Sequence, residues 1–234
     1  MTKRTRLLHG FLIGVVALGL SATVQAQEFS IARIYIEYNA SAEDLGFHVS
    51  VDGENWNRFR IVHPNGTTIF DVEGRGAYGQ LGMTELFFEG AEPALADFPL
   101  ANLLALMPEG TYTFIGRTVD GRTLMSTPTL SHAVPAGPVV SAKVDDGEVQ
   151  IRWRRVTAPP PGFPNRPIQI VGYQVIVGSF QVTLPASVTK VNLPREFVKS
   201  LERGEHAFEV LAIDVSGNQT LTEGTFEIGR GDDD

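Results

Sequence analysis

Acidic and amide side chains gather in one short stretch of the sequence, where a strand-like run ends and a turn begins. They are Glu37, Asn39, Glu43 and Asp44. Hard cations such as Ca²⁺ take about six to eight oxygen ligands at about 2.3–2.6 Å, and such a turn could supply several. The spacing is not that of the helix-loop-helix Ca²⁺ loop, and polar residues are also what a hairpin turn requires. A Ca²⁺ site and a purely structural turn therefore both stay open.

Other patterns that carry catalysis are missing from the sequence. It has no cysteine, and the histidines after residue 26 stand far apart, at His48, His63, His132 and His206. None of them has the spacing of a metal-ligand pair. No Gly-x-Ser-x-Gly element occurs, and no long helix follows the glycines of residues 74–79, as a dinucleotide site would require. These patterns predict a protein that is not an enzyme and has no cofactor, with Ca²⁺ as the open exception.

Two aromatic residues are candidate binding residues. Trp56 follows Asp52-Gly53, a pair that is typical of hairpin turns, and Tyr78 lies among glycines. An aromatic side chain exposed at a loop tip often contacts sugars or partner proteins. A tryptophan buried in the core explains the same pattern at Trp56 equally well.

The charge of the chain argues against one class of partner. Without Lys3, Arg4 and Arg6, the sequence has 16 basic and 27 acidic residues, a net charge of −11. An acidic surface repels phosphate backbones, so we expect no nucleic-acid partner.

The first 26 residues have the pattern of a signal peptide. A basic start precedes an apolar run at residues 11–20, and small residues at 24–26 suit a signal peptidase. The apolar run is shorter than the roughly 20 residues of a membrane-spanning helix. We expect a secreted or periplasmic protein, without a membrane span after cleavage of the signal.

Short alternating segments predict an all-β fold of two β-sandwich domains. In the first domain, residues 27–137, strand patterns cover residues 30–38, 47–51, 56–62, 67–72, 111–119 and 122–130. Leucines at helical spacing after Asp97, which could cap the helix, predict a short inserted helix. The uncharged Pro- and Gly-containing segment at residues 133–138 predicts a linker with few contacts. We expect an immunoglobulin-like sandwich in this domain.

The second domain is expected at residues 138–229, followed by an acidic tail at 230–234. Trp153 lies in a strand-like run, and residues 168–177 form the β-branched run that would face it across a sandwich. Five prolines in residues 158–167 exclude a central strand and predict an extended loop.

Three segments of this second domain resemble a fibronectin type III domain. They are Trp153, the Ile170-Val-Gly-Tyr-Gln-Val175 run and Phe208-Glu-Val-Leu-Ala212, and the following Asp214-Val-Ser-Gly-Asn218 is similar to the last hairpin of bacterial immunoglobulin-like modules. The resemblance covers roughly residues 138–228, the length of one such domain, and implies a β-sandwich. His206 stands where the family has its corner tyrosine, and a helix-like segment at residues 195–203 replaces a short turn.

The sequence thus predicts an exported, non-catalytic binding or structural module, with protein–protein interaction at the bacterial envelope as its role. The alternative is an accessory protein that binds Ca²⁺ or a glycan. The partner, an unknown protein or glycan, is not identified by any motif.

Overall fold

A computed structural model describes residues 26–229 of the chain. Residues 1–25 of the expected signal peptide and the expected acidic tail lie outside the described residues. Within the described part, no helix has the length and apolar character needed to cross a membrane.

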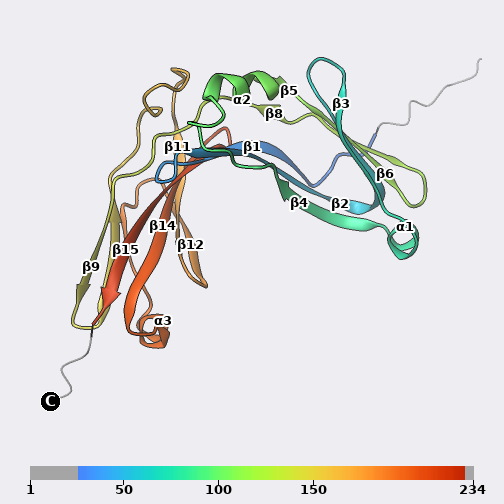
Figure 1. Cartoon of the computed structure of the whole chain (residues 1–234). Coiled ribbons are helices and arrows are strands. Elements are labelled where there is room, and N and C mark those ends of the chain that lie inside the picture. Colours follow the sequence, from blue (N-terminus) through green and yellow to red (C-terminus); the bar gives the residue numbers. More distant parts are fainter. Residues whose placement is uncertain (1–25, 230–234) are drawn as a thin grey trace, which may run out of the picture.

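The described chain is an all-β protein built on one large, bent sheet of ten strands (Figure 1). These strands run in the order β12 (Phe180–Pro185), β11 (Ile170–Val177), β14 (Gly204–Asp214), β15 (Gln219–Ile228), β1 (Ile31–Asn39), β2 (Asp44–Val62), β6 (Thr113–Thr118) and β7 (Thr123–Ser126), while β3 (Thr68–Glu73) and β4 (Met83–Glu89) pair with β2. The smaller sheets are β13 (Lys190–Asn192), β10 (Glu148–Trp153) and β9 (Val140–Asp145), and the pair β5 (Gly110–Thr111) and β8 (Thr129–Leu130). The helices are α1 (Ala77–Leu81), α2 (Leu100–Leu106) and α3 (Arg195–Ser200).

Strand β1 follows the alternation in its sequence. Ile34, Ile36 and Tyr38 are buried, and the residues between them lie on the opposite face of the sheet. The strand pairs with residues 44–52 of β2 in an antiparallel hairpin, closed by the turn that the polar segment predicts. Strand pairing therefore places Tyr35 opposite His48 and Glu37 opposite Gly46.

Strand β2 continues through the position where Asp52-Gly53 predicts a turn, so that prediction is wrong. The strand is 19 residues long and changes partners at an irregularity between Asp52 and Trp56. Its first part pairs with β1 and β4, and its second part pairs with β3 and β6. Gly53 serves close packing here, because a Cβ at this position would lie 2.8 Å from Cδ1 of Phe29.

The predicted helix of the first half is α2, which covers one end of the core. Leu103 is buried, and its neighbours Leu100 and Leu104 pack against the core cluster. Asp97 does not cap this helix. Pro99 occupies the N-cap position, without a side-chain hydrogen bond, because the helix begins at Leu100, two residues later than a cap at Asp97 would require.

The second half has the two-sheet sandwich that the resemblance implies. The three-stranded sheet β13-β10-β9 and the strands β12-β11-β14-β15 enclose one hydrophobic cluster. Trp153 is 5% exposed, with its ring 5.5 Å from that of Tyr173. The hydroxyl of Tyr173 accepts a hydrogen bond of 2.9 Å from the backbone N–H of Val156. The proline-rich residues 158–167 form an extended loop, as predicted.

The two halves are joined by backbone pairing rather than by a linker alone. Residues 37–39 of β1 pair in parallel with residues 219–221 of β15, so the large sheet runs from one half into the other. The prediction that residues 133–138 make few contacts is wrong, because Ala133, Val134 and Pro135 are buried. Figure 1 shows two arms that meet at this junction.

One buried side chain, Asn218, holds three segments at the junction. Its Oδ1 accepts a 2.7 Å hydrogen bond from the backbone N–H of Ile36, and its Nδ2 donates to the carbonyls of Ser131 and Ala133 at 2.8 and 3.1 Å. Asn218 comes from the second half and is fully buried, so these bonds replace water at backbone groups of the first half. The sequence suggests that Asn218 stabilises its own turn, whereas its side chain bonds to other segments.

Further contacts reinforce the same junction. Thr220 Oγ1 donates to the carbonyl of Pro135 at 2.5 Å. From the proline-rich loop, Arg166 forms an ion pair with Glu109, and the Phe163 ring lies 4.8 Å from that of Tyr38. The loop of the second half thus packs back onto the first half.

Candidate functional site

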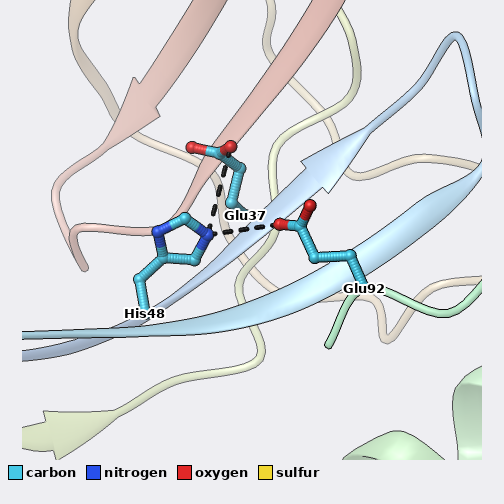
Figure 2. Close-up of side chains that lie close together, drawn as sticks. All are labelled: Glu37, His48 and Glu92. Carbon is cyan, nitrogen blue, oxygen red and sulfur yellow. Dashed lines mark hydrogen bonds and ion pairs between the residues drawn. The ribbon is translucent and has the colours of Figure 1, made fainter. Parts of the chain in front are cut away.

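The candidate site lies on the open face of the sheet, the face opposite both hydrophobic clusters. Glu37 is half-buried and points to this side, because its neighbours Ile36 and Tyr38 point into the core. His48 comes from the paired strand β2, and Glu92 from the segment that follows β4. Figure 2 shows the three side chains converging. In Figure 1, the open faces of both arms are turned toward the inside of the bend.

The Nε2 atom of His48 is the centre of this cluster. It lies 3.4 Å from Oε1 of Glu92, 3.7 Å from Oε2 of Glu89 and 4.0 Å from Oε1 of Glu37. One ligand atom each of Glu37, His48 and Glu92 can be chosen so that all three lie within 4.8 Å of one another. Among the described residues, this is the group of histidine and carboxylate side chains whose spacing suits a metal ion.

The histidine is held firmly by its surroundings. It is 3% exposed, and its ring centroid lies 5.0 Å from that of Tyr35 and 5.7 Å from that of Phe87. Its Nδ1 is buried and has no hydrogen-bond partner in the described part of the chain, so Nε2 is the ring atom that meets the carboxylates. The second carboxylate oxygen of Glu37 accepts a hydrogen bond from Gln219 of β15, which fixes Glu37 from the other half of the molecule.

Among the described residues, no lysine or arginine forms an ion pair with the carboxylates of the cluster. Within residues 26–229, the ion pairs of Glu37, Glu89 and Glu92 all lead to the single imidazole of His48. Burial raises the pKa of the Glu92 carboxyl, and the negative charges of Glu89 and Glu37 raise it further, against the lowering effect of the hydrogen bond to His48. The site therefore has an excess of negative charge.

Of the four residues that the sequence predicts to bind a cation, Glu37 belongs to the histidine cluster and the other three do not. Asn39 is occupied by its turn: its Oδ1 accepts the backbone N–H groups of Ser41 and Ala42, while its Nδ2 donates to Glu223. Glu43 adopts a positive φ of 56° within the same turn. Burial and the charge of Glu223 raise the pKa of Asp44, which the structure does not bring into the histidine cluster.

The two aromatic residues predicted to bind a partner differ in exposure: Trp56 is buried, and Tyr78 is exposed. Trp56 is fully buried, and its Nε1 donates to the carbonyl of Thr84 at 3.3 Å, so its ring is unavailable to a partner. The turn that would have exposed it does not form. Tyr78 lies on α1 and is 65% exposed. Its role in binding stays a prediction.

A hollow of about 620 Å³ lies beside the cluster and is lined by both halves of the molecule. Arg33 and Tyr35 come from β1, and Gln219, Gln174 and Thr183 come from three strands of the second half. The guanidinium of Arg33 lies 5.2 Å from the centre of the Tyr35 ring. The hollow spans five neighbouring strands of the large sheet, so its shape depends on the junction between the halves.

Replacing Glu209 by glutamine should raise thermal stability at pH 7.5. Burial raises the pKa of Glu209, and the charges of Glu223, its direct cross-strand partner, and of Glu37 add to the shift. A carboxyl with a raised pKa in the folded state stabilises the fold while protonated, and that stability is lost as the pH rises through the folded pKa. We expect a gain of about 0.5 kcal/mol at pH 7.5 that disappears near pH 4, measured by thermal unfolding. The matched control is Glu28→Gln, at an exposed site, which should change stability little at either pH.

No protein-family model matches this sequence. No curated protein matches it either. The solved structures to which it is similar include a two-domain fibronectin type III segment of chicken tenascin, at 12% identity and a TM-score of 0.30, over 86% of this chain and 100% of that one.

Two further proteins are among the similar structures. The BSP domain of a biofilm-associated protein has 14% identity and a TM-score of 0.27, over 88% of this chain and 30% of that chain. The spore cortex lytic enzyme SleM of Clostridium perfringens has 18% identity and a TM-score of 0.31, over 41% of this chain and 28% of that chain. This chain spans less than a third of the length of either protein. The second half is a sandwich because its two sheets face each other and bury Trp153 between them.

Proposed function

We propose that this chain is an exported, non-catalytic binding module that presents the hollow inside its bend to a protein partner at the bacterial envelope. The main support for this proposal is the way in which the two halves are joined. Backbone pairing of β1 with β15 and the bonds of Asn218 hold the two halves at one angle, and the hollow is lined by residues from both. A surface fixed in this way binds with less loss of conformational entropy than one between freely hinged domains.

The chemistry of the hollow supports a protein partner. It combines a tyrosine ring and an arginine with amide and hydroxyl groups, which can exchange hydrogen bonds with a peptide backbone. Tyrosine and arginine are also the residue types that contribute most to protein interfaces. The signal-like start of the sequence supports the export of the chain.

The test is capture of envelope proteins with the purified chain, followed by calorimetry with each captured protein. Arg33→Ala and Gln174→Ala remove one hollow residue from each half, and Tyr78→Ala removes the exposed tyrosine of α1. If the hollow is the interface, both hollow variants weaken binding at least tenfold, as interface anchors do, whereas Tyr78→Ala, at the other candidate site, binds like the parent. Binding that survives both hollow substitutions and is lost in Tyr78→Ala would place the interface at α1 instead. Specific binding in a glycan array, with no protein captured, would contradict a protein partner.

A further inference from the structure

We propose that Glu37, His48 and Glu92 form a binding site for a divalent transition-metal ion, of which Zn²⁺ is the best match, with Glu89 as a fourth ligand. The inference concerns a different part of the open face from the hollow and does not depend on a protein partner.

The distances around His48 suit a tetrahedral ion. Zn²⁺ binds imidazole nitrogen and carboxylate oxygen at about 2.0–2.2 Å, so neighbouring ligand atoms of a tetrahedron lie about 3.4 Å apart. Glu92 Oε1 is already 3.4 Å from His48 Nε2, and the oxygens of Glu89 and Glu37 are 3.7 and 4.0 Å away. Modest side-chain rotations of the glutamates complete the geometry.

The buried imidazole separates this site from an ordinary acidic surface. His48 is 3% exposed, and the one ring nitrogen with polar neighbours, Nε2, points into the carboxylates (Figure 2). Its single hydrogen-bond contact, at 3.4 Å, is at the long limit for such bonds. A cation bonded to Nε2 would give this nitrogen a strong partner and would neutralise carboxylates that have no arginine or lysine within the described residues.

The ligand set also selects the type of ion. Ca²⁺ and Mg²⁺ prefer oxygen ligands, and Ca²⁺ takes about six to eight of them. Imidazole together with carboxylates suits Zn²⁺ and its neighbours in the first transition row. The structure therefore favours a different ion from the Ca²⁺ that the sequence suggests, at a site that shares Glu37 with it.

The backbone prepares the position of Glu92. Gly46 lies on β2 opposite Glu37, and its missing side chain leaves the space that Glu92 fills. A Cβ at position 46 would lie 2.6 Å from Oε1 of Glu92. Substitution of Gly46 by alanine therefore displaces a ligand without removing any metal-binding group, and the cost to the fold is small because the flexible end of a glutamate yields.

The test is a calorimetric titration of ZnCl₂ into the chelator-treated protein. We expect one saturable site for each chain, and at least tenfold weaker binding in His48→Gln, Glu92→Gln and Gly46→Ala. The matched control is His206→Ala, because the Nε2 of His206 contacts the carbonyl of Glu202, far from the cluster along β14. This variant should bind Zn²⁺ like the parent protein.

Co²⁺ provides a second readout that does not depend on affinity alone. Tetrahedral Co²⁺ at the site should show an intense visible absorption band, which Glu92→Gln and Gly46→Ala should weaken even if His48→Gln fails to fold. No saturable binding of Zn²⁺ by the parent protein would overturn the proposal. Binding that is unchanged in both Glu92→Gln and Gly46→Ala, or a site that takes Ca²⁺ in preference to Zn²⁺, would overturn it as well.

Discussion

Replacing Asn218 by alanine should lower the free energy of unfolding by about 3 kcal/mol or more. The substitution removes three hydrogen bonds and leaves the N–H of Ile36 and the carbonyls of Ser131 and Ala133 without their partner. Asn218 is fully buried, so water does not replace these bonds freely. Each buried polar group left unpaired costs about 1–3 kcal/mol. Urea unfolding, followed by tryptophan fluorescence, measures the change.

The matched control for this prediction is Asn192→Ala. Asn192 is exposed on β13, where its Oδ1 accepts a hydrogen bond from Gln150. Its removal should change stability by no more than about 0.5 kcal/mol, as for most surface substitutions. If Asn218→Ala were as stable as Asn192→Ala, the asparagine would not be holding the halves together.

Replacing Trp153 by alanine should cost about 3–5 kcal/mol, because it empties the space between the two sheets of the second half. Trp153→Phe should cost much less. The Nε1 of Trp153 is buried and has no hydrogen-bond partner within residues 26–229. Phenylalanine therefore gives up contact area but no hydrogen bond, and it removes an unpaired polar group. Thermal unfolding of both variants gives the two values.

Trp56 provides the comparison for Trp153→Phe. Its Nε1 donates to the carbonyl of Thr84, so Trp56→Phe loses a buried hydrogen bond in addition to contact area. We expect Trp56→Phe to be the less stable of the two phenylalanine variants by about 1 kcal/mol. The opposite order would mean that the indole of Trp153 has a polar partner after all.

Local patterns in the sequence predict much of this fold. The alternation of Ile34, Ile36 and Tyr38 identifies β1 and its buried face, and the burial of Trp153 against Tyr173 follows from two strand-like runs. Asp146 and Gly147, which both have positive φ, form a turn of the kind that an Asp-Gly pair favours. These features depend on residues that are close together in the sequence, so one sequence is enough to predict them.

Features that depend on distant segments are the ones that the sequence does not predict. The Asp52-Gly53 pair is typical of a turn, yet β2 runs through it because the strand has partners on both sides of that point. The parallel pairing of β1 with β15 joins residues about 180 positions apart, and nothing in either strand specifies its partner. Asn218 has the residue type and position of a turn residue, and its hydrogen-bond partners lie too far away in the sequence to be predicted from it.

Some residues of the candidate metal site can be predicted from the sequence, and others cannot. The carboxylate at Glu37 stands out from the sequence, and the hairpin between β1 and β2 would place His48 close to it once the strands are paired in register. Glu92 lies 44 positions beyond His48, in a segment without regular structure, so no local pattern connects the two. The missing side chain of Gly46, which makes room for Glu92, is visible only in three dimensions.

We infer that the two halves form one rigid body, held together at the β1–β15 junction. The natural sequence has no cysteine, so single spin labels can be placed at Tyr78→Cys in the first half and Val144→Cys in the second, both exposed positions. Pulsed electron–electron double resonance between the labels should give one narrow distance distribution, which broadens when Asn218→Ala is added. A distribution as broad in the parent protein as that of two domains on a flexible linker would contradict the claim.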